Sequence, residues 1–487
     1  MTFTPAPSTP PPPHAMLLGD WADPARVFAG GPARHPHVFW LDAGADAATG
    51  HSYLGLGTPV EVETVLAVGL SGQDGGARSA GAGFGGALPA DALPAGVGGF
   101  QGGYVGWFGY EWGAAHAGLG PGAGAASGGR AETPGPGAAP AGAAPSSAAP
   151  SSAWLRVDEF VAFDHAARQV WVVAPAERVE AFAALVHGWI RAGEAAASEA
   201  PAPAPERTAR SGHSAAEHAA LVGECLEIIR SGDAYQLCLT TQFAVAAGAV
   251  PFDAPSVYAA LRASSPSHHA GFIRIEDTAV LSASPEQFLG VSGGRVRTKP
   301  IKGTRPRGHD AASDAALAAE LRASVKEQAE NIMIVDLMRN DLARVCEPGS
   351  VDVDELLAIE SYAQVHQLVS TVSGRLRAGS TVSELLAATF PAGSMTGAPK
   401  RSAMAQLRRL ERAPRGIYAG CWGYIGRDGT ADLAMVIRTI VVRGDVATVG
   451  SGGGITSGSV VDEEVREVGV KVRAPLAVLG AAVPEGW

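Results

Sequence analysis

Cysteine is scarce in this sequence and is not arranged in pairs. Only four of the 487 residues are cysteine, and no C-x-x-C pair occurs. A disulfide framework or a zinc site of the usual spacing is therefore not expected. We interpret the four as reduced, mostly buried thiols of a cytoplasmic protein; they are Cys225, Cys238, Cys346 and Cys421.

Long apolar runs and a basic surface are also lacking. No window of about 18 consecutive apolar residues occurs, so no membrane-spanning helix is expected. The N-terminal stretch "MTFTPAPSTPPPPHAM" has no charged segment followed by an apolar core, which is not typical of a secretion signal. The formal net charge is −11, so neither a nucleic acid nor an anionic membrane is expected as a partner.

Two stretches lack the large side chains that a core requires. Residues 113–153 are almost entirely Gly, Ala, Pro and Ser, and a second such stretch ends in "APAPAPE". Neither buries enough apolar surface to offset the entropy of ordering. The composition predicts an N-terminal region over 14–192 with a disordered insertion at 113–153, a flexible linker over 193–210, and a catalytic region over 211–482.

The remaining sequence alternates strand-like and helix-like patterns. β-Branched runs joined by short glycine-containing turns, as in "GYIGRDGTADLAMVIR", predict antiparallel hairpins. The fold class predicted is α+β with large antiparallel sheets. Neither a P-loop nor G-x-G-x-x-G after a strand is present, so nucleotide binding is not expected. Apolar periodicity predicts helices over 214–231, 312–346, 380–389, 399–411 and 459–480.

A local basic run, "RVRTKPIKGTRPRG", stands out in this acidic chain at residues 295–308. A solvated basic strand is the ordinary explanation of such a run. The residues alone also allow a site for a small anion, or chemistry performed by the central Lys302.

Two helical segments each present a pair of glutamates. Glu327 and Glu330 are three residues apart and share a helix face. On the last helix Glu464 and Glu467 share a face with Lys471, and Ser459 is a candidate N-cap. Solvated surface charge explains most such glutamates. Four carboxylates on two helices could also hold a hard divalent cation, and such ligands suit Mg²⁺.

Eight motifs in order between residues 213 and 480 carry a family resemblance. The sequence resembles the chorismate-utilising enzymes, which include anthranilate synthase component I, aminodeoxychorismate synthase component I, and the isochorismate and salicylate synthases. The resemblance implies an anthranilate synthase component I-like fold, with a β-sandwich core surrounded by helices. The motifs are "SASPEQFL", "PIKGTRPRG", "AENIMIVDLMRNDLARV", "VHQLVSTVSG", "FPAGSMTGAPK", "GIYAGCWGYIG", "IRTIVV" and "GGGI".

Three positions point to one branch of this family. Gln236 in "AYQLCL" stands where the water-adding members carry a lysine base, and an amide cannot take up a proton. Lys302 in "PIKGT" replaces the alanine of anthranilate synthases and is similar to the proposed nucleophile of aminodeoxychorismate synthases. Ser394 in "GSMTGAPK" is also more similar to that branch.

The resemblance implies a covalent route. Lys302 would attack C2 of chorismate while Glu286, similar to the family's general acid, protonates the departing C4 hydroxyl. Ammonia would then add at C4 and expel the lysine, giving 4-amino-4-deoxychorismate for 4-aminobenzoate and folate or for an antibiotic. An attacking lysine must be a free amine. Neighbouring cations favour that form, and Lys299, Arg305 and Arg307 lie near Lys302 in the sequence, although strand alternation can point some of them away.

The resemblance also assigns binding roles. Glu330 and Glu467 would hold Mg²⁺, with Glu327 and Glu464 beside them or acting through water. Arg438 and Tyr418 would bind the enolpyruvyl carboxylate, and Lys471 would lie near the ring carboxylate. The backbone at Gly453 and Gly454 would form an anion-binding nest. Thr304 and Gln236 are further candidate substrate-binding residues.

Three residues depart from the family pattern, and one activity is missing. Gln367 stands where many members have a histidine, Pro475 predicts a kink in the last helix, and Ala43 replaces a serine beside the tryptophan pocket of several relatives. No G-x-C-x-G elbow of a glutaminase occurs, so ammonia is expected from a separate glutamine amidotransferase subunit. An anthranilate-type lyase and an inactive chorismate-binding paralogue remain the alternatives, and the oligomeric state stays open.

Overall fold

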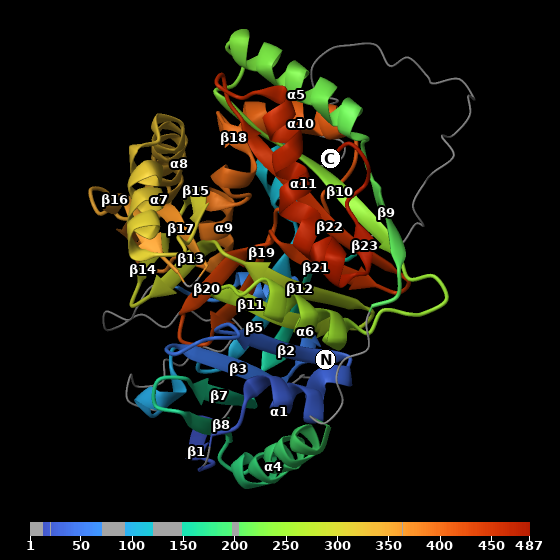
Figure 1. Ribbon diagram of the computed structural model, residues 1–487. Helices are drawn as coiled ribbons and strands as arrows, with labels where there is room; N and C mark the ends of the chain where they lie inside the picture. The colour runs from blue at the N-terminus through green and yellow to red at the C-terminus, as the bar shows by residue number, and fades with distance from the viewer. Residues whose placement is uncertain (1–12, 20, 71–92, 120–148, 197–203, 363) are drawn as a thin grey trace, which may run out of the picture.

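Two large, mostly antiparallel β-sheets build the molecule, with helices outside them (Figure 1). The computed structural model describes residues 13–19, 21–70, 93–119, 149–196, 204–362 and 364–487. Among the described strands, β9 and β23 form the one parallel pair. This architecture confirms the predicted α+β class. All four cysteines are buried free thiols, as expected.

The first sheet has 13 strands. The predicted hairpin segments are strands of this sheet and of the second one. Their β-branched residues favour strands because such side chains pack well on a pleated surface. In spatial order the strands are β1 (Pro13–Leu17), β8 (Gln169–Pro175), β7 (Phe160–Asp164), β3 (His51–Leu56), β2 (His37–Asp42), β11 (His269–Ile275), β12 (Thr278–Ser284), β21 (Thr439–Arg443), β22 (Val446–Ile455), β10 (Gln236–Ala246), β9 (Arg207–Ser211) and β23 (Ala481–Ala482), with β18 (Gly397–Ala398) also on β10.

The second sheet has 10 strands. It contains the strand of the basic run, which pairs with β17 and is interrupted by a bulge between Lys302 and Thr304. In spatial order the strands are β15 (Ile301–Pro306), β17 (Val365–Arg375), β14 (Arg295–Thr298), β13 (Gln287–Ser292), β20 (Ala431–Met435), β19 (Cys421–Gly426), β5 (Gly103–Phe108), β6 (Ser152–Val157) and β4 (Thr58–Val60), with β16 (Asp352–Ser361) on the other side of β17.

The N-terminal region is built into both sheets. Strand β2 pairs with β11, and β5 pairs with β19, so residues before and after the expected linker share hydrogen-bonded ladders. Residues 113–119 of the expected insertion are helical, and β9 begins inside the expected linker at Arg207. The centre of the insertion lies outside the described residues.

The apolar faces of the two sheets meet in a shared core. Phe39 and Val280 from the first sheet are buried in one cluster with Val105, Trp107 and Trp422 from the second. Since successive side chains of a strand point to opposite faces, the other faces of both sheets remain to be covered by helices. This is the β-sandwich core expected from the resemblance.

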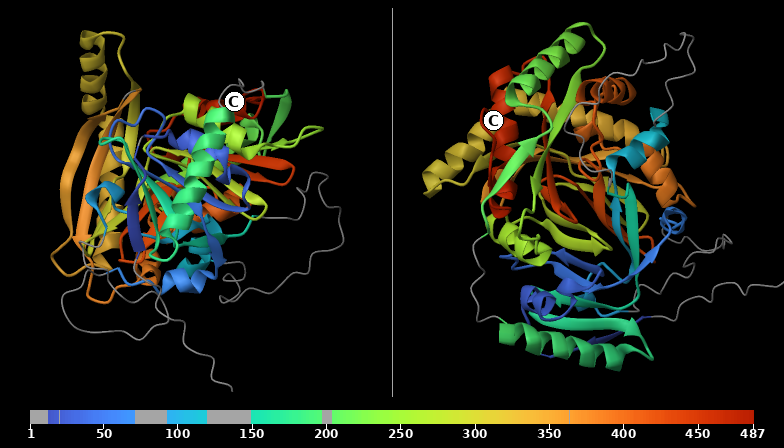
Figure 2. Two further views of the ribbon diagram at one scale, coloured as in Figure 1. Left: turned by 90° about the horizontal axis from the view of Figure 1, so that it is seen from below. Right: turned by 90° about the vertical axis from the view of Figure 1, so that its right-hand side faces the viewer.

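Helices cover the outer faces and the ends of the sheets. Figures 1 and 2 show α4 at one end of the molecule and α5 at the opposite end. The expected helix over 312–346 is two helices, because Ser324 takes an extended conformation and caps the second one. The helices are α1 (Pro24–Gly30), α2 (Val62–Leu66), α3 (Tyr110–Ala114), α4 (Val179–Ala196), α5 (Ala215–Arg230), α6 (Ala254–Ser264), α7 (Ala311–Ala323), α8 (Val325–Ala343), α9 (Val382–Thr389), α10 (Lys400–Glu411) and α11 (Val461–Val478).

Within the described part of the chain, none of these helices combines the length and apolar character needed to cross a bilayer. Helix α11 continues through Pro475.

Two of the points at which the chain passes from one sheet to the other are neighbours in space. Between β12 and β13 it crosses at Glu286, and between β20 and β21 it crosses at Arg438. The crossings are hydrogen-bonded to each other, because Met435 N donates to Glu286 O and Ala283 N donates to Arg438 O. Arg438 has a φ of +52°, which lets the chain turn there. Two candidate site residues are thus held together by the topology itself.

Candidate active site

Glu286 is a buried carboxylic acid with a pKa suited to proton transfer. Burial raises its pKa to about 7, although the charge of Lys302 and a 3.0 Å hydrogen bond from Ser394 Oγ act in the opposite direction. A group that is half protonated near neutral pH can give a proton to a leaving hydroxyl. Ser394 thus contacts the candidate acid directly, which the sequence did not indicate.

Lys302 extends from β15 to a point where three other elements meet. Its Nζ lies 3.9 Å from Glu330 Oε2 on α8. A Cβ atom added to Gly454 of β22 would lie 3.3 Å from that nitrogen and 2.7 Å from Nε2 of Gln236 on β10. Lys302 and Gln236 therefore converge over the backbone of Gly454, and only a residue without a side chain leaves them this space.

Gln236 is fully buried and has a free amide. Neither Oε1 nor Nε2 has a hydrogen-bond partner among the described residues. An unpaired buried amide is costly, and such groups are found where a ligand completes the hydrogen bonding. The amide therefore fits the predicted role of Gln236 in substrate binding.

The three cations expected around Lys302 are paired with carboxylates, and Arg305 reaches Glu327 beside the site as well. Each of them forms an ion pair with a carboxylate, and the ion pair of Lys302 itself is with Glu330, while its charge also acts on Glu286. These pairs do not support the expectation that the three cations act on Lys302. The pairs are Lys299 with Glu360, Arg305 with Glu320, and Arg307 with Asp314.

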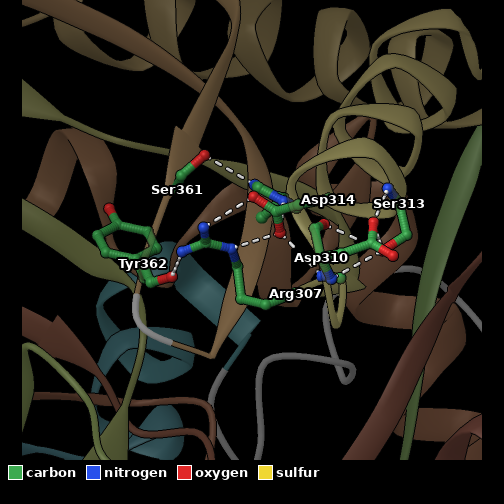
Figure 3. A network of polar contacts seen from close by, with 8 residues as sticks. Arg307, Asp310, Ser313, Asp314, Ser361 and Tyr362 are labelled. Atoms are coloured by element: carbon green, nitrogen blue, oxygen red, sulfur yellow. Dashed lines mark hydrogen bonds and ion pairs between the residues drawn. The ribbon is translucent and has the colours of Figure 1, made fainter.

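Arg307 belongs to a polar network between α7 and β17, drawn in Figure 3. Asp314 accepts two hydrogen bonds from Arg307 and one from the Gly308 backbone. His366 bridges this carboxylate and Ser361 Oγ, with distances of 2.9 and 2.7 Å. This network fixes the chain just beyond β15, the strand that carries Lys302.

Gln367 follows His366 on β17. Adjacent residues of a strand point to opposite faces, so Gln367 points away from the network of His366. It is buried, and it is the cross-strand partner of Thr304, with which it shares a face. Thr304 is exposed, and its hydroxyl has no hydrogen-bond partner in the described part of the chain.

The four candidate metal ligands gather between α8 and α11, and their charges act on one another. Each carboxylate lies within ion-pair distance of a different cation. The pairs are Glu330 with Lys302 (3.9 Å), Glu464 with Lys326 (3.8 Å), Glu467 with Lys471 (2.6 Å) and Glu327 with Arg305 (3.8 Å).

Burial and mutual repulsion act strongly on these carboxylates. Burial raises the pKa of Glu330, Lys302 lowers it, and Glu327 raises it again. Burial likewise raises the pKa of Glu464, against a 2.7 Å hydrogen bond from Ser459. Burial alone would raise the pKa of Glu467, but Lys471 holds it below its ordinary value.

This donor set fits a hard divalent cation in its chemistry. Oxygen ligands from carboxylates are the ones Mg²⁺ prefers, and the pKa of Glu330 and of Glu464 is raised first by burial and then by the charge of neighbouring glutamates. No three acidic, histidine or cysteine side chains among the described residues lie close enough to form a ready-made metal cluster. Binding would therefore draw the carboxylates together.

Arg438 and Tyr418 lie near each other, as their expected shared role requires. Burial raises the pKa of Tyr418, whose ring packs against Gly450. Arg438 is an exposed residue and has no ion-pair partner among the residues that the structure describes; partial burial of its guanidinium lowers its pKa, against the charges of Tyr418 and Glu467. A free guanidinium beside the site is suited to a carboxylate ligand.

Gly453 and Gly454 do not form the expected nest. Both are extended residues of β22 and pair with β10 opposite Leu239 and Cys238, and neither has a positive φ. The predicted nest is therefore wrong, because a nest requires alternating backbone conformations. Because these residues have no side chain, they leave room for the site residues beside them. A Cβ atom at Gly453, for example, would lie 2.9 Å from Glu464 Oε2.

Lys471 lies against the same strand, where its ammonium donates to Gly452 O at 2.7 Å. Ser459 is not the N-cap of α11, since that position is Val460; its hydroxyl instead donates to Glu464. Lys326 was not identified from the sequence as a residue of this site. It stands four residues before Glu330 on α8, and this spacing could have revealed it.

A separate cavity of about 330 Å³ lies away from these residues, between strands of both sheets. Ala43, His51, His269, Trp422 and Asp432 are among the residues that line it, and none of the candidate catalytic residues does. Ala43 is thus at a cavity, as the resemblance suggested for this position.

A known family model covers the whole region that contains the candidate site. The family model for chorismate binding enzymes matches residues 131–477, which includes every candidate site residue. The chain belongs to this chorismate binding enzyme family.

Curated members of the chorismate binding enzyme family are similar along most of this chain. Aminodeoxychorismate synthase from Streptomyces pristinaespiralis is 41% identical over 81% of this chain and 53% of its own length. The protein of that name from Streptomyces griseus is 40% identical over 67% of this chain and 46% of its own length. The chain thus spans about half the length of these two relatives. Anthranilate synthase component 1 from Streptomyces coelicolor is 39% identical over 68% of this chain and 67% of its own length.

Solved structures have the same fold. Anthranilate synthase component I from Streptococcus pneumoniae superposes with a TM-score of 0.65 at 25% identity, covering 98% of this chain and 94% of that one. The menaquinone-specific isochorismate synthase MenF from Escherichia coli also gives 0.65, at 17% identity, covering 97% and 95% of the two chains. These matches confirm the anthranilate synthase component I-like fold.

Proposed function

We propose that this chain is the chorismate-aminating component of an aminodeoxychorismate synthase. It replaces the C4 hydroxyl of chorismate by an amino group and leaves the enolpyruvyl group in place. The observation that carries the proposal is the position of Lys302, beside Gln236 and 3.9 Å from Glu330 over the backbone of Gly454. The two Streptomyces relatives named aminodeoxychorismate synthase support the same reaction.

The first step joins Lys302 to the substrate. The free amine forms a bond from Nζ to C2 of chorismate and becomes a secondary ammonium, the ring double bonds shift, and the C4–O bond breaks. The departing hydroxyl takes a proton from Glu286 and leaves as water. With a pKa of about 7, Glu286 is protonated often enough to act as this acid and strong enough to give the proton up.

The second step restores the lysine. Ammonia forms a bond to C4, the double bonds shift back, and the bond between C2 and Nζ breaks. The product is 4-amino-4-deoxychorismate. Ammonia reaches the site from a glutamine amidotransferase partner, or directly from ammonium salts in an assay.

Substrate capture relies on local positive charge, because chorismate is a dianion and the chain carries a net charge of −11. Arg438 binds one carboxylate with a guanidinium that has no other ion-pair partner in the described structure, and Tyr418 lies beside it. Gln236 supplies an unpaired buried amide. Lys471 lies toward the second carboxylate, held by Gly452 O.

Mg²⁺ is the cofactor that fits the glutamates. Glu330 and Glu467 would hold it, with Glu327 and Glu464 beside them. A bound metal would neutralise the ring carboxylate of chorismate and compensate the negative charge of Glu330, which lies 3.9 Å from Lys302. With the charge of Glu330 compensated, Lys302 would release its proton more easily.

An anthranilate-type lyase is the second candidate, because relatives named anthranilate synthase component 1 are also 39–42% identical. The two reactions differ in one product. Incubation with chorismate, Mg²⁺ and ammonium, followed by mass spectrometry, should give an amino product that keeps the enolpyruvyl group. Release of pyruvate in equal amount with anthranilate would assign the chain to the other reaction.

A further inference from the structure

Lys326 has a different position from the other cations of the carboxylate cluster. It stands on α8, one residue before Glu327 and four before Glu330, and its ammonium lies 3.8 Å from Glu464 of α11. It therefore connects the two helices that carry the four glutamates. Its side chain is 46% exposed, whereas those of the other three cations are 16–30% exposed: Lys302 16%, Arg305 25% and Lys471 30%.

The charge of Lys326 acts on the whole cluster. Burial lowers its pKa, but Glu464, Glu330, Glu467 and Glu327 together raise it above the ordinary value. Lys302 is the least exposed of the four cations, and Lys471 donates a separate hydrogen bond to the carbonyl of Gly452. Lys326 has no further polar contact among the described residues apart from these glutamates.

Before a divalent cation binds, each of the four carboxylates at this site is already paired with a cation. One of these cations must move away, because a lysine and a metal ion cannot neutralise the same carboxylate at close range without repelling each other. Lys326 is the half-exposed one, at the first turn of its helix, and a long lysine side chain can turn into water at little cost.

We propose that Lys326 is a tethered cation that holds the place of the divalent metal among the four glutamates and sets how tightly the site binds it. With no metal, its ammonium keeps α8 and α11 together against the repulsion of their carboxylates. When the metal binds, Lys326 turns out to solvent. The proposal rests on the proposed function only for the identity of the metal site.

The test is Mn²⁺ binding by the full chain in the absence of chorismate, followed by electron paramagnetic resonance of free Mn²⁺. Lys326→Met should lower the dissociation constant by about tenfold or more, the size expected for removing a unit charge near a divalent ion even at a well-hydrated site. Lys326→Arg should bind like the wild type. The matched control is Arg339→Met on the solvent side of the same helix, where Arg339 pairs with Asp336; it removes the same charge and should leave binding unchanged.

A second measurement follows metal-free stability. Without metal, Lys326→Met should unfold at a lower temperature than the wild type, and Mn²⁺ should raise its melting temperature by more. If Lys326→Met binds Mn²⁺ no more tightly than the wild type, or if neither protein binds it, the proposal is overturned. Because no turnover is measured, loss of the proposed amination activity would leave this result unaffected.

Discussion

Ser394 donates a 3.0 Å hydrogen bond to Glu286 and thereby stabilises the charged form of a carboxylate whose pKa burial raises to about 7. Removing this bond in Ser394→Ala should raise the pKa of Glu286 further. Since the acid must be protonated to act, kcat/KM falls as the pH rises through its pKa. The alkaline limb of the pH profile should therefore move to higher pH in this variant.

Ser402→Ala is the control for that shift, because the Ser402 hydroxyl donates to Asp233 O instead of to a site residue. Its profile should match the wild type. An alkaline limb that stays in place or moves to lower pH in Ser394→Ala would mean that Glu286 is not the acid.

Gly454→Ala tests the space shared by Lys302 and Gln236. The new Cβ atom would lie 2.7 Å from Gln236 Nε2, closer than real contacts allow, and 3.3 Å from Lys302 Nζ. Displacing either group should reduce kcat/KM by about tenfold or more while the fold is kept. Gly458→Ala, whose Cβ atom would meet nothing within 4 Å, should be unaffected. Equal kinetics for the two variants would contradict this account of Gly454.

Glu330→Gln and Glu467→Gln should both abolish metal-dependent turnover, but they should differ in stability. Burial raises the pKa of Glu330, so its contribution to stability is present at low pH and is lost as the pH rises through the folded value. Lys471 lowers the pKa of Glu467, so its contribution is present above the ordinary pKa and is lost as the pH falls through the folded value.

At pH 7.5 without metal, thermal melts should therefore place Glu330→Gln at or above the wild type and Glu467→Gln below it. The reverse order would show that the charges of the two carboxylates are not balanced as described. Near-wild-type turnover of both variants without added metal would rule out their role in binding Mg²⁺.

Sequence patterns predicted the fold class, because the strand and helix periods are strong in the motif-rich region. They could not show that β2 and β5 complete the same sheets as β11 and β19, since such pairing joins residues far apart in the chain. The break at Ser324 escaped notice because the apolar pattern continues across it, and only the backbone turn at the cap separates α7 from α8.

At the site, the motifs identified residue types but not their neighbours. Lys299, Arg305 and Arg307 are close to Lys302 in sequence, yet each one pairs with a carboxylate on another element. Conversely, Ser394 and Glu286 are 108 residues apart and form a hydrogen bond. Charge environments of this kind depend on tertiary contacts and cannot be read from spacing along one strand.

The most direct test of the account concerns Lys302 itself. The protein is incubated with chorismate and Mg²⁺ but no ammonia, and its intact mass is measured, with peptide mapping of the modified residue. The account predicts a gain equal to chorismate minus water on Lys302 of the wild type, and none on Lys302→Ala or on Lys302→Arg, whose guanidinium stays protonated. Absence of the adduct, together with an unchanged rate of 4-amino-4-deoxychorismate formation by Lys302→Arg, would contradict it and reduce Lys302 to an electrostatic contact.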